Sequence, residues 1–83
     1  MKAKLQVVSV EDINLSDGSK SGEQVKFMAV CGVDPFKEGG YSDDNTFAKW
    51  TPTANLEMRI SNENLFGTLV PGQKYYVDFK LAE

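Results

Sequence analysis

The sequence predicts a mainly β protein, because two segments alternate strictly between apolar and polar residues. In residues 55–61 the apolar positions are Leu56, Met58 and Ile60. In residues 74–81 they are Tyr75, Val77, Phe79 and Leu81. A period of two gives a strand one buried and one solvent-facing side. Both segments are therefore predicted to be strands with their apolar residues in the core.

The connection between these two strands predicts one short helical turn near residues 63–69. Asn62 or Asn64 is a suitable N-terminal cap for such a turn, and Gly67 is suitable for its end. Pro71 and Gly72 then fit the two central positions of a type II turn that leads into the last strand.

The N-terminal part of the chain predicts two further strands. In residues 2–11 the apolar positions change phase at Val7 and Val8, which indicates a β-bulge or a strand covered on both sides. Residues 11–22 are polar and rich in turn formers, so they are expected to connect the strands as a loop. Residues 23–32 are apolar on both faces, which predicts a central strand.

The remaining segment, residues 33–53, is a long connection in which residues 46–50 could add a short strand. The whole chain, residues 1–83, is then a single β domain of four to five strands. The architecture is either a small antiparallel sheet or a partly closed, OB-like barrel. The predicted core is Leu5, Val7, Val25, Phe27, Ala29, Leu56, Met58, Ile60, Leu65, Tyr75, Val77, Phe79 and Leu81.

Composition argues against catalysis and against several classes of partner. The chain has no histidine, one cysteine and no nucleotide-binding or nucleophile motif, so neither an enzyme nor a cofactor is predicted. Cys31 has apolar neighbours and is expected to be buried. The net charge of −3 disfavours nucleic acid without excluding it. No segment is apolar enough to span a bilayer, so no membrane contact is predicted.

Candidate binding residues lie in the long connection and in the last strand. The connection combines aromatic and acidic side chains, the composition of an interaction hot spot with a polar rim. Tyr76 occupies the polar side of an alternating strand and is expected to be exposed or covered by a loop. The acidic residues lack the spacing of a calcium-binding loop, so no metal site is predicted. The candidates are Phe36, Tyr41, Asp43, Asp44, Phe47, Trp50 and Tyr76.

The same aromatic residues allow other interpretations. Phe47 and Trp50 could cap the core beneath the long connection. Together with Tyr76 they could instead stack on unpaired bases, with nearby lysines contacting phosphates, as in an OB-like protein that binds single-stranded DNA.

Several stretches resemble a family of small proteins encoded by tailed bacteriophages. They are Met1–Lys4, Ser42–Ala48, Thr51–Thr53, Leu56–Ile60 and Pro71–Phe79. The resemblance covers most of the chain and implies a viral origin, but it supplies no catalytic or binding residues.

The expected function combines this resemblance with the absence of catalytic motifs. It is a non-enzymatic, phage-encoded module that binds proteins, either its own copies or a virion protein. The alternative is an inhibitor that binds a host protein. The expected location is the cytoplasm of the host cell or the virion.

Overall fold

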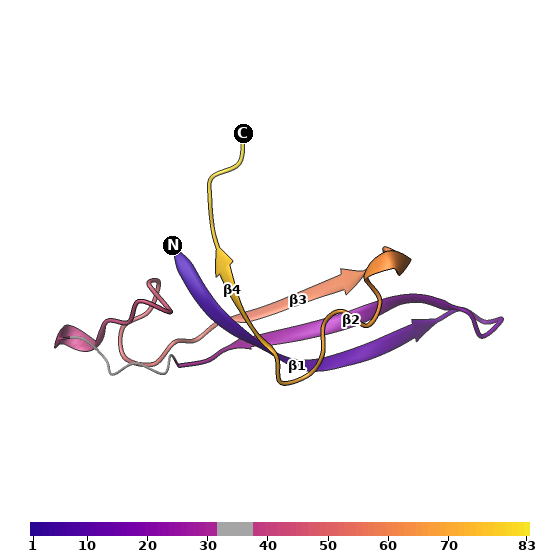
Figure 1. The fold of residues 1–83 in the computed structure, drawn as a ribbon, viewed down its shortest axis with the longest axis horizontal. Helices are drawn as coiled ribbons and strands as arrows, with labels where there is room; N and C mark the ends of the chain where they lie inside the picture. The colour runs from indigo at the N-terminus through magenta and orange to yellow at the C-terminus, as the bar shows by residue number, and fades with distance from the viewer. Residues whose placement is uncertain (32–37) are drawn as a thin grey trace.

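The computed structural model describes residues 1–31 and 38–83, which form one four-stranded antiparallel sheet with the order β3–β2–β1–β4 (Figure 1). The strands are β1 (Lys2–Asn14), β2 (Lys20–Ala29), β3 (Asn55–Ile60) and β4 (Lys74–Asp78). Two single-turn 3₁₀ helices, η1 (Glu38–Gly40) and η2 (Glu63–Leu65), lie in the connections. The predicted mainly β fold is confirmed. The edge strands β3 and β4 do not pair, so the sheet is open and the barrel alternative is wrong.

The β1–β2 hairpin is longer than the sequence predicts, because residues 11–14 and 20–22 belong to its strands. Its turn is short: the backbone N–H of Leu15 donates to the Ser19 carbonyl at 2.7 Å. Gly18 within the turn has a φ of 89°, a left-handed conformation that glycine adopts at little cost. Pairing with a neighbouring strand thus overrides the turn-forming preference of these polar residues.

A β-bulge interrupts the β1–β2 pairing where the apolar phase changes. Val7 lies opposite Phe27, whereas Ser9 lies opposite Lys26, so Val8 is the additional residue. The bulge predicted near Val7 and Val8 is confirmed. It returns Val10 to the apolar side of the sheet, opposite Val25.

Strand β1 pairs with two different strands along its length. Its first residues pair with β4, from Lys2 opposite Asp78 to Gln6 opposite Lys74. From Leu5 onward it pairs with β2. Figure 1 shows β1 descending beside β4 and then turning to run along β2. Bulges increase local bending and twist, which accounts for this change of direction.

The connection between β3 and β4 has the predicted turns. The Asn62 side chain accepts a hydrogen bond from the backbone N–H of Asn64 at 3.1 Å and caps η2. Gly72 has a φ of 95°, and the backbone N–H of Gln73 donates to the Val70 carbonyl at 3.1 Å. This is the pattern of a type II turn with glycine at its third position.

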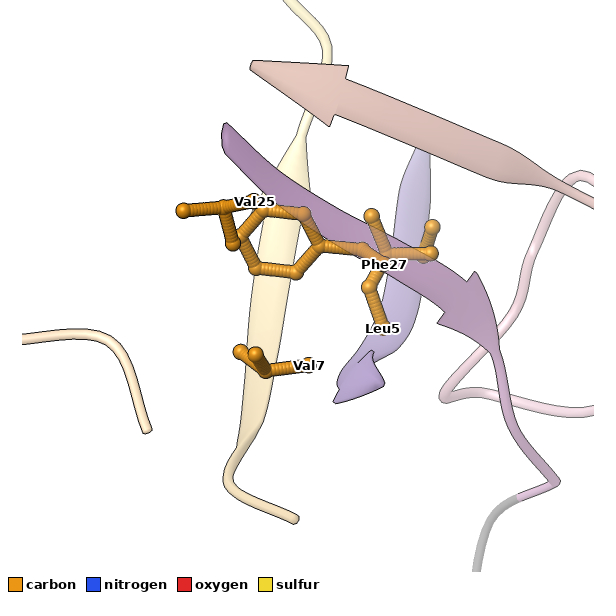
Figure 2. Close-up of a cluster of buried hydrophobic side chains, with 5 residues drawn as sticks. Leu5, Val7, Val25 and Phe27 are labelled. Carbon is orange, nitrogen blue, oxygen red and sulfur yellow. The ribbon is translucent and has the colours of Figure 1, made fainter. Parts of the chain in front are cut away.

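The buried core lies on one face of the sheet and comes from β1 and β2. Figure 2 shows Leu5, Val7, Val25 and Phe27 gathered there, and Ala3 completes the buried cluster. Partly buried residues pack against it, among them Ala29, Leu56, Ile60, Tyr75 and Val77.

Four residues predicted for the core are exposed instead: Met58, Leu65, Phe79 and Leu81. Strand β4 ends at Asp78, so Phe79 and Leu81 continue its alternation beyond the sheet. Met58 lies opposite the buried Val25, but it belongs to the edge strand β3. Cys31 is also exposed, contrary to its expected burial, because it follows the end of β2.

The molecule is thin and extended for its length. Its radius of gyration is 15.6 Å, and its principal dimensions are 55 × 32 × 17 Å. A compact domain of this length has a radius of gyration of about 12 Å. The accessible surface is 5954 Å², whereas a compact monomer of 9.2 kDa exposes about 4,900 Å². The single sheet thus leaves an excess of about 1,000 Å² in contact with solvent.

Candidate protein-binding surface

The long connection after β2 is fixed to the sheet through the buried side chain of Asn45, which is 1% exposed. The backbone N–H of Lys4 donates to Asn45 Oδ1 at 2.8 Å. Asn45 Nδ2 donates to the Val30 carbonyl at 2.8 Å. One amide thus joins β1 to the segment that follows β2 and satisfies two backbone groups that would otherwise lack partners.

The next residue, Thr46, continues this attachment along β1. Its backbone N–H donates to the Lys2 carbonyl at 2.9 Å, and the Lys2 N–H donates to Thr46 Oγ1 at 2.8 Å. The chain then turns, because the Ala48 N–H donates to the Asn45 carbonyl at 3.1 Å. Residues 46–50 therefore do not form the additional strand that the sequence allowed.

Two of the predicted site residues, Asp44 and Tyr76, meet on the polar face of the sheet. The Tyr76 hydroxyl donates to Asp44 Oδ1 at 2.8 Å, and Lys4 Nζ lies 3.4 Å from Asp44 Oδ2. Lys2 Nζ lies 4.8 Å from the centroid of the Tyr76 ring, within the range of a cation–π interaction. The hydrogen bond from Tyr76, followed by that from Lys4, lowers the pKa of the Asp44 carboxyl. This cluster holds the long connection against β1 and β4.

Trp50 and Tyr41 lie beside the glycines of η1. A Cβ atom on Gly40 would be 2.3 Å from the Trp50 indole, so only glycine allows this close approach. The backbone N–H of Trp50 donates to the Gly40 carbonyl at 2.7 Å, and Trp50 has a φ of 65°. Lys49 Nζ lies 5.7 Å from the centroid of the Tyr41 ring. Both aromatic side chains are exposed.

Of the other three predicted site residues, Phe47 and Asp43 lie in the described part of the chain. Phe47 is half-buried and packs against the core, so the core-capping interpretation is confirmed for Phe47, whereas Trp50 is exposed. Asp43 is exposed. Phe36 lies outside the described residues. Among the described residues, a hydrogen bond joins Tyr76 to Asp44, and Tyr41 and Trp50 both lie against glycines of η1.

An apolar pocket of about 340 Å³ opens on the core face where β1 and β3 begin. The buried residues Ala3 and Leu5 of β1 line it, together with Phe47 of the long connection. The complete lining is Met1, Ala3, Leu5, Phe47, Thr53, Ala54, Asn55, Leu56 and Phe79. Its lining is nearly all apolar, which suits an apolar side chain of a protein partner better than a charged ligand.

Two of the apolar residues that line this pocket are themselves exposed. Phe79 is 55% exposed and Met1 is 67% exposed, although both line the pocket. Leu81, which follows β4, is fully exposed. We call the pocket together with Met1, Phe79 and Leu81 the open end of the sheet. Sequence reasoning placed Phe79 and Leu81 in the core, and the residues that end β4 gave no signal that the strand stops at Asp78.

Comparisons with protein-family models, with curated proteins and with solved structures found no match. Among residues 1–31 and 38–83, no helix has the length and apolar character needed to cross a membrane. Within the same residues, no three side chains of His, Cys, Asp or Glu are grouped closely enough to hold a metal ion.

Proposed function

We propose that this chain is a non-enzymatic protein–protein binding module, encoded by a phage and associated with its own copies or with a virion protein. The open end of the sheet is the observation that supports this function. Phe79 exposes a large apolar side chain in the lining of a pocket that is nearly all apolar, and Leu81, two residues further along the chain, is fully exposed. Grouped apolar side chains in contact with water are typical of surfaces that bind another protein.

The area of the molecule supports the same function. The excess surface of about 1,000 Å² is close to the roughly 800 Å² that each partner contributes to a standard interface. The core is small, with five buried apolar side chains among the described residues. Binding of a partner to the folded form therefore adds stability that the chain does not supply alone.

Quantitative mass spectrometry of purified virions, combined with affinity capture, tests this function. We expect the chain in virions at a fixed copy number, and we expect capture of a virion protein by the wild-type chain. Replacement of Leu81 by Ser should abolish capture, because Leu81 belongs to the open end. The matched control is Val8→Ser, which removes an exposed apolar side chain from the bulge of β1 and should leave capture intact.

Inhibition of a host protein is the competing function, and the same experiment separates the two. The long connection presents Tyr41 and Trp50 as exposed aromatic residues that do not line the pocket. Absence from virions, with capture of one host protein that is lost in Tyr41→Ala or Trp50→Ala, would replace the virion role by an inhibitory one. Absence from virions without any captured protein would contradict a protein-binding function.

Binding of single-stranded nucleic acid has less support. The Tyr76 ring is exposed but already contacts Lys2, and its hydroxyl is bonded to the acidic Asp44. We therefore expect no quenching of Trp50 fluorescence when an oligonucleotide is added at low salt. Quenching that weakens steeply as salt rises would restore this function.

A further inference from the structure

We infer that a second copy of this chain binds the outer edge of β4, with residues 75–83 of the two copies paired antiparallel around a twofold axis at Phe79. The inference rests on the proposed function, and it names the partner as the chain itself. It is carried by the position of β4 in the sheet, by the charges along residues 74–83 and by the exposed apolar residues Phe79 and Leu81.

Strand β4 is an edge of the sheet formed by the described residues. The backbone N–H of Phe79 donates to the Met1 carbonyl at 2.9 Å, so the backbone of Phe79 faces β1. Backbone groups alternate in direction along a strand, and those of Asp78 and Lys80 therefore face the outer side. Such an edge can pair with a strand of another molecule.

Charge disfavours several registers for pairing between identical copies. An axis at Asp78 would place two carboxylates opposite each other, and an axis at Lys80 would place two ammonium groups opposite each other. An axis at Val77 would oppose Lys74 and Lys80. An axis at Phe79 instead sets Asp78 of each copy opposite Lys80 of the other, which gives two attractive cross-strand pairs.

Apolar contacts favour the same register. With the axis at Phe79, the two Phe79 residues face each other, and Val77 of one copy lies opposite Leu81 of the other. Val77 packs against the core and Phe79 lines the pocket, so the apolar face of one molecule would continue into the next. An axis at Tyr76 also opposes unlike charges, Lys74 and Asp78, but it leaves Leu81 outside the ladder.

The β3 edge is the competing place for a second copy. An axis at Met58 would oppose Glu57 and Arg59, so this edge is self-complementary as well. Its apolar residues Leu56 and Ile60 are already half-buried against the core, whereas Met58 is 42% exposed. Pairing at β3 would shield Met58 alone, whereas pairing at β4 shields the more exposed Leu81 and Phe79 together, which are 102% and 55% exposed.

Charge exchange within residues 78–80 tests the pairing. Sedimentation equilibrium of the wild-type chain should give twice the 9.2 kDa mass of one copy at high concentration. D78K and K80D each create two like-charge pairs in this register, so each should dissociate at least about tenfold more readily. The double variant D78K/K80D should dimerise as the wild type does. A mixture of the two single variants should form the mixed dimer.

The matched control is E57K, which makes the same change of charge at the β3 edge and should leave the dimer unchanged. Urea unfolding of every variant checks that the monomer remains folded. A wild-type chain that stays monomeric at about 100 µM, dimers that persist in both single variants, or a dimer lost in E57K would each overturn the pairing at β4. Capture of a virion protein by a monomeric chain would leave the proposed function standing, which separates the two failures.

Discussion

The centre and the open end of the sheet carry the same kind of side chain on the same face, yet they differ in burial. Phe27 in the centre is 5% exposed, whereas Phe79 at the open end is 55% exposed. Both belong to stretches with a period of two. The comparison shows that alternation assigns a residue to a face, but a second layer of chain decides whether that face is buried.

The centre has such a layer because the connection between β3 and β4 passes over it. Leu69 of this connection packs against the core. The backbone N–H of Gly67 donates to Glu23 Oε1 at 3.2 Å, and Lys20 Nζ donates to Glu23 Oε2 at 2.8 Å. At the open end, Phe47 packs against the core in a similar way, but it is only one of the residues that line the pocket.

The largest expected effect is on the free energy of unfolding, when a phenylalanine is truncated in the centre and at the open end. Phe27→Ala should lower the free energy of unfolding by about 3–5 kcal/mol, because it empties a buried position. Phe79→Ala should lower it by less than about 1 kcal/mol at concentrations where the chain is monomeric. Urea unfolding measures both values. If Phe27→Ala does not fold, Phe27→Leu should remain measurable at a cost of about 1 kcal/mol. Equal costs at the two positions would remove the distinction between them.

A smaller loss of stability is expected when Asn45 is replaced, because its side chain holds the long connection against β1. Asn45→Ala leaves the Lys4 N–H and the Val30 carbonyl without their partner and should cost about 2–4 kcal/mol. Trp50 fluorescence should change as well, because the connection is released from β1. The control is Asn64→Ala, an exposed amide in η2, which should cost less than about 0.5 kcal/mol. An Asn45→Ala variant as stable as the wild type would mean that other contacts hold the long connection against β1.

The smallest expected effect concerns the layer over the centre and depends on pH. Hydrogen bonds to Glu23, the largest from Lys20, lower the pKa of its carboxyl below the ordinary value of 4.5. Its contribution to stability is therefore present above pH 4.5 and is lost as the pH falls through the pKa of the folded state. Glu23→Gln should lower the urea midpoint at pH 7, and the difference from the wild type should shrink below pH 4.5. A difference that stays constant down to pH 3 would contradict this role.

The sequence was sufficient to predict features that depend on local chemistry. The phase change at Val7 and Val8 gave the bulge, and the Pro71–Gly72 pair gave the turn before β4. In the hairpin, however, the ends of the strands depend on long-range pairing. Residues 11–14 look like a loop until residues 20–24 of the neighbouring strand are placed beside them.

The candidate site was predicted only in part, for the same reason. Tyr76 was expected on the polar face and lies there, but nothing in the sequence indicated that Asp44 would be bonded to it. Asn45 was overlooked because an isolated asparagine in a polar loop has no pattern that marks it as buried. Phe79 was assigned to the core because alternation continues after the hydrogen-bonded strand has ended.

The pairing of Lys2 with Asp78 has a consequence for how the chain is completed during synthesis. The β1–β2 hairpin needs only residues 2–29 and can form early, since its contacts are local. The edge of β1 that pairs with β4 stays without its partner until β4 has left the ribosome. A chain interrupted before residue 74 would therefore display an unpaired strand edge next to Ala3 and Leu5, the kind of surface that aggregates or attracts chaperones.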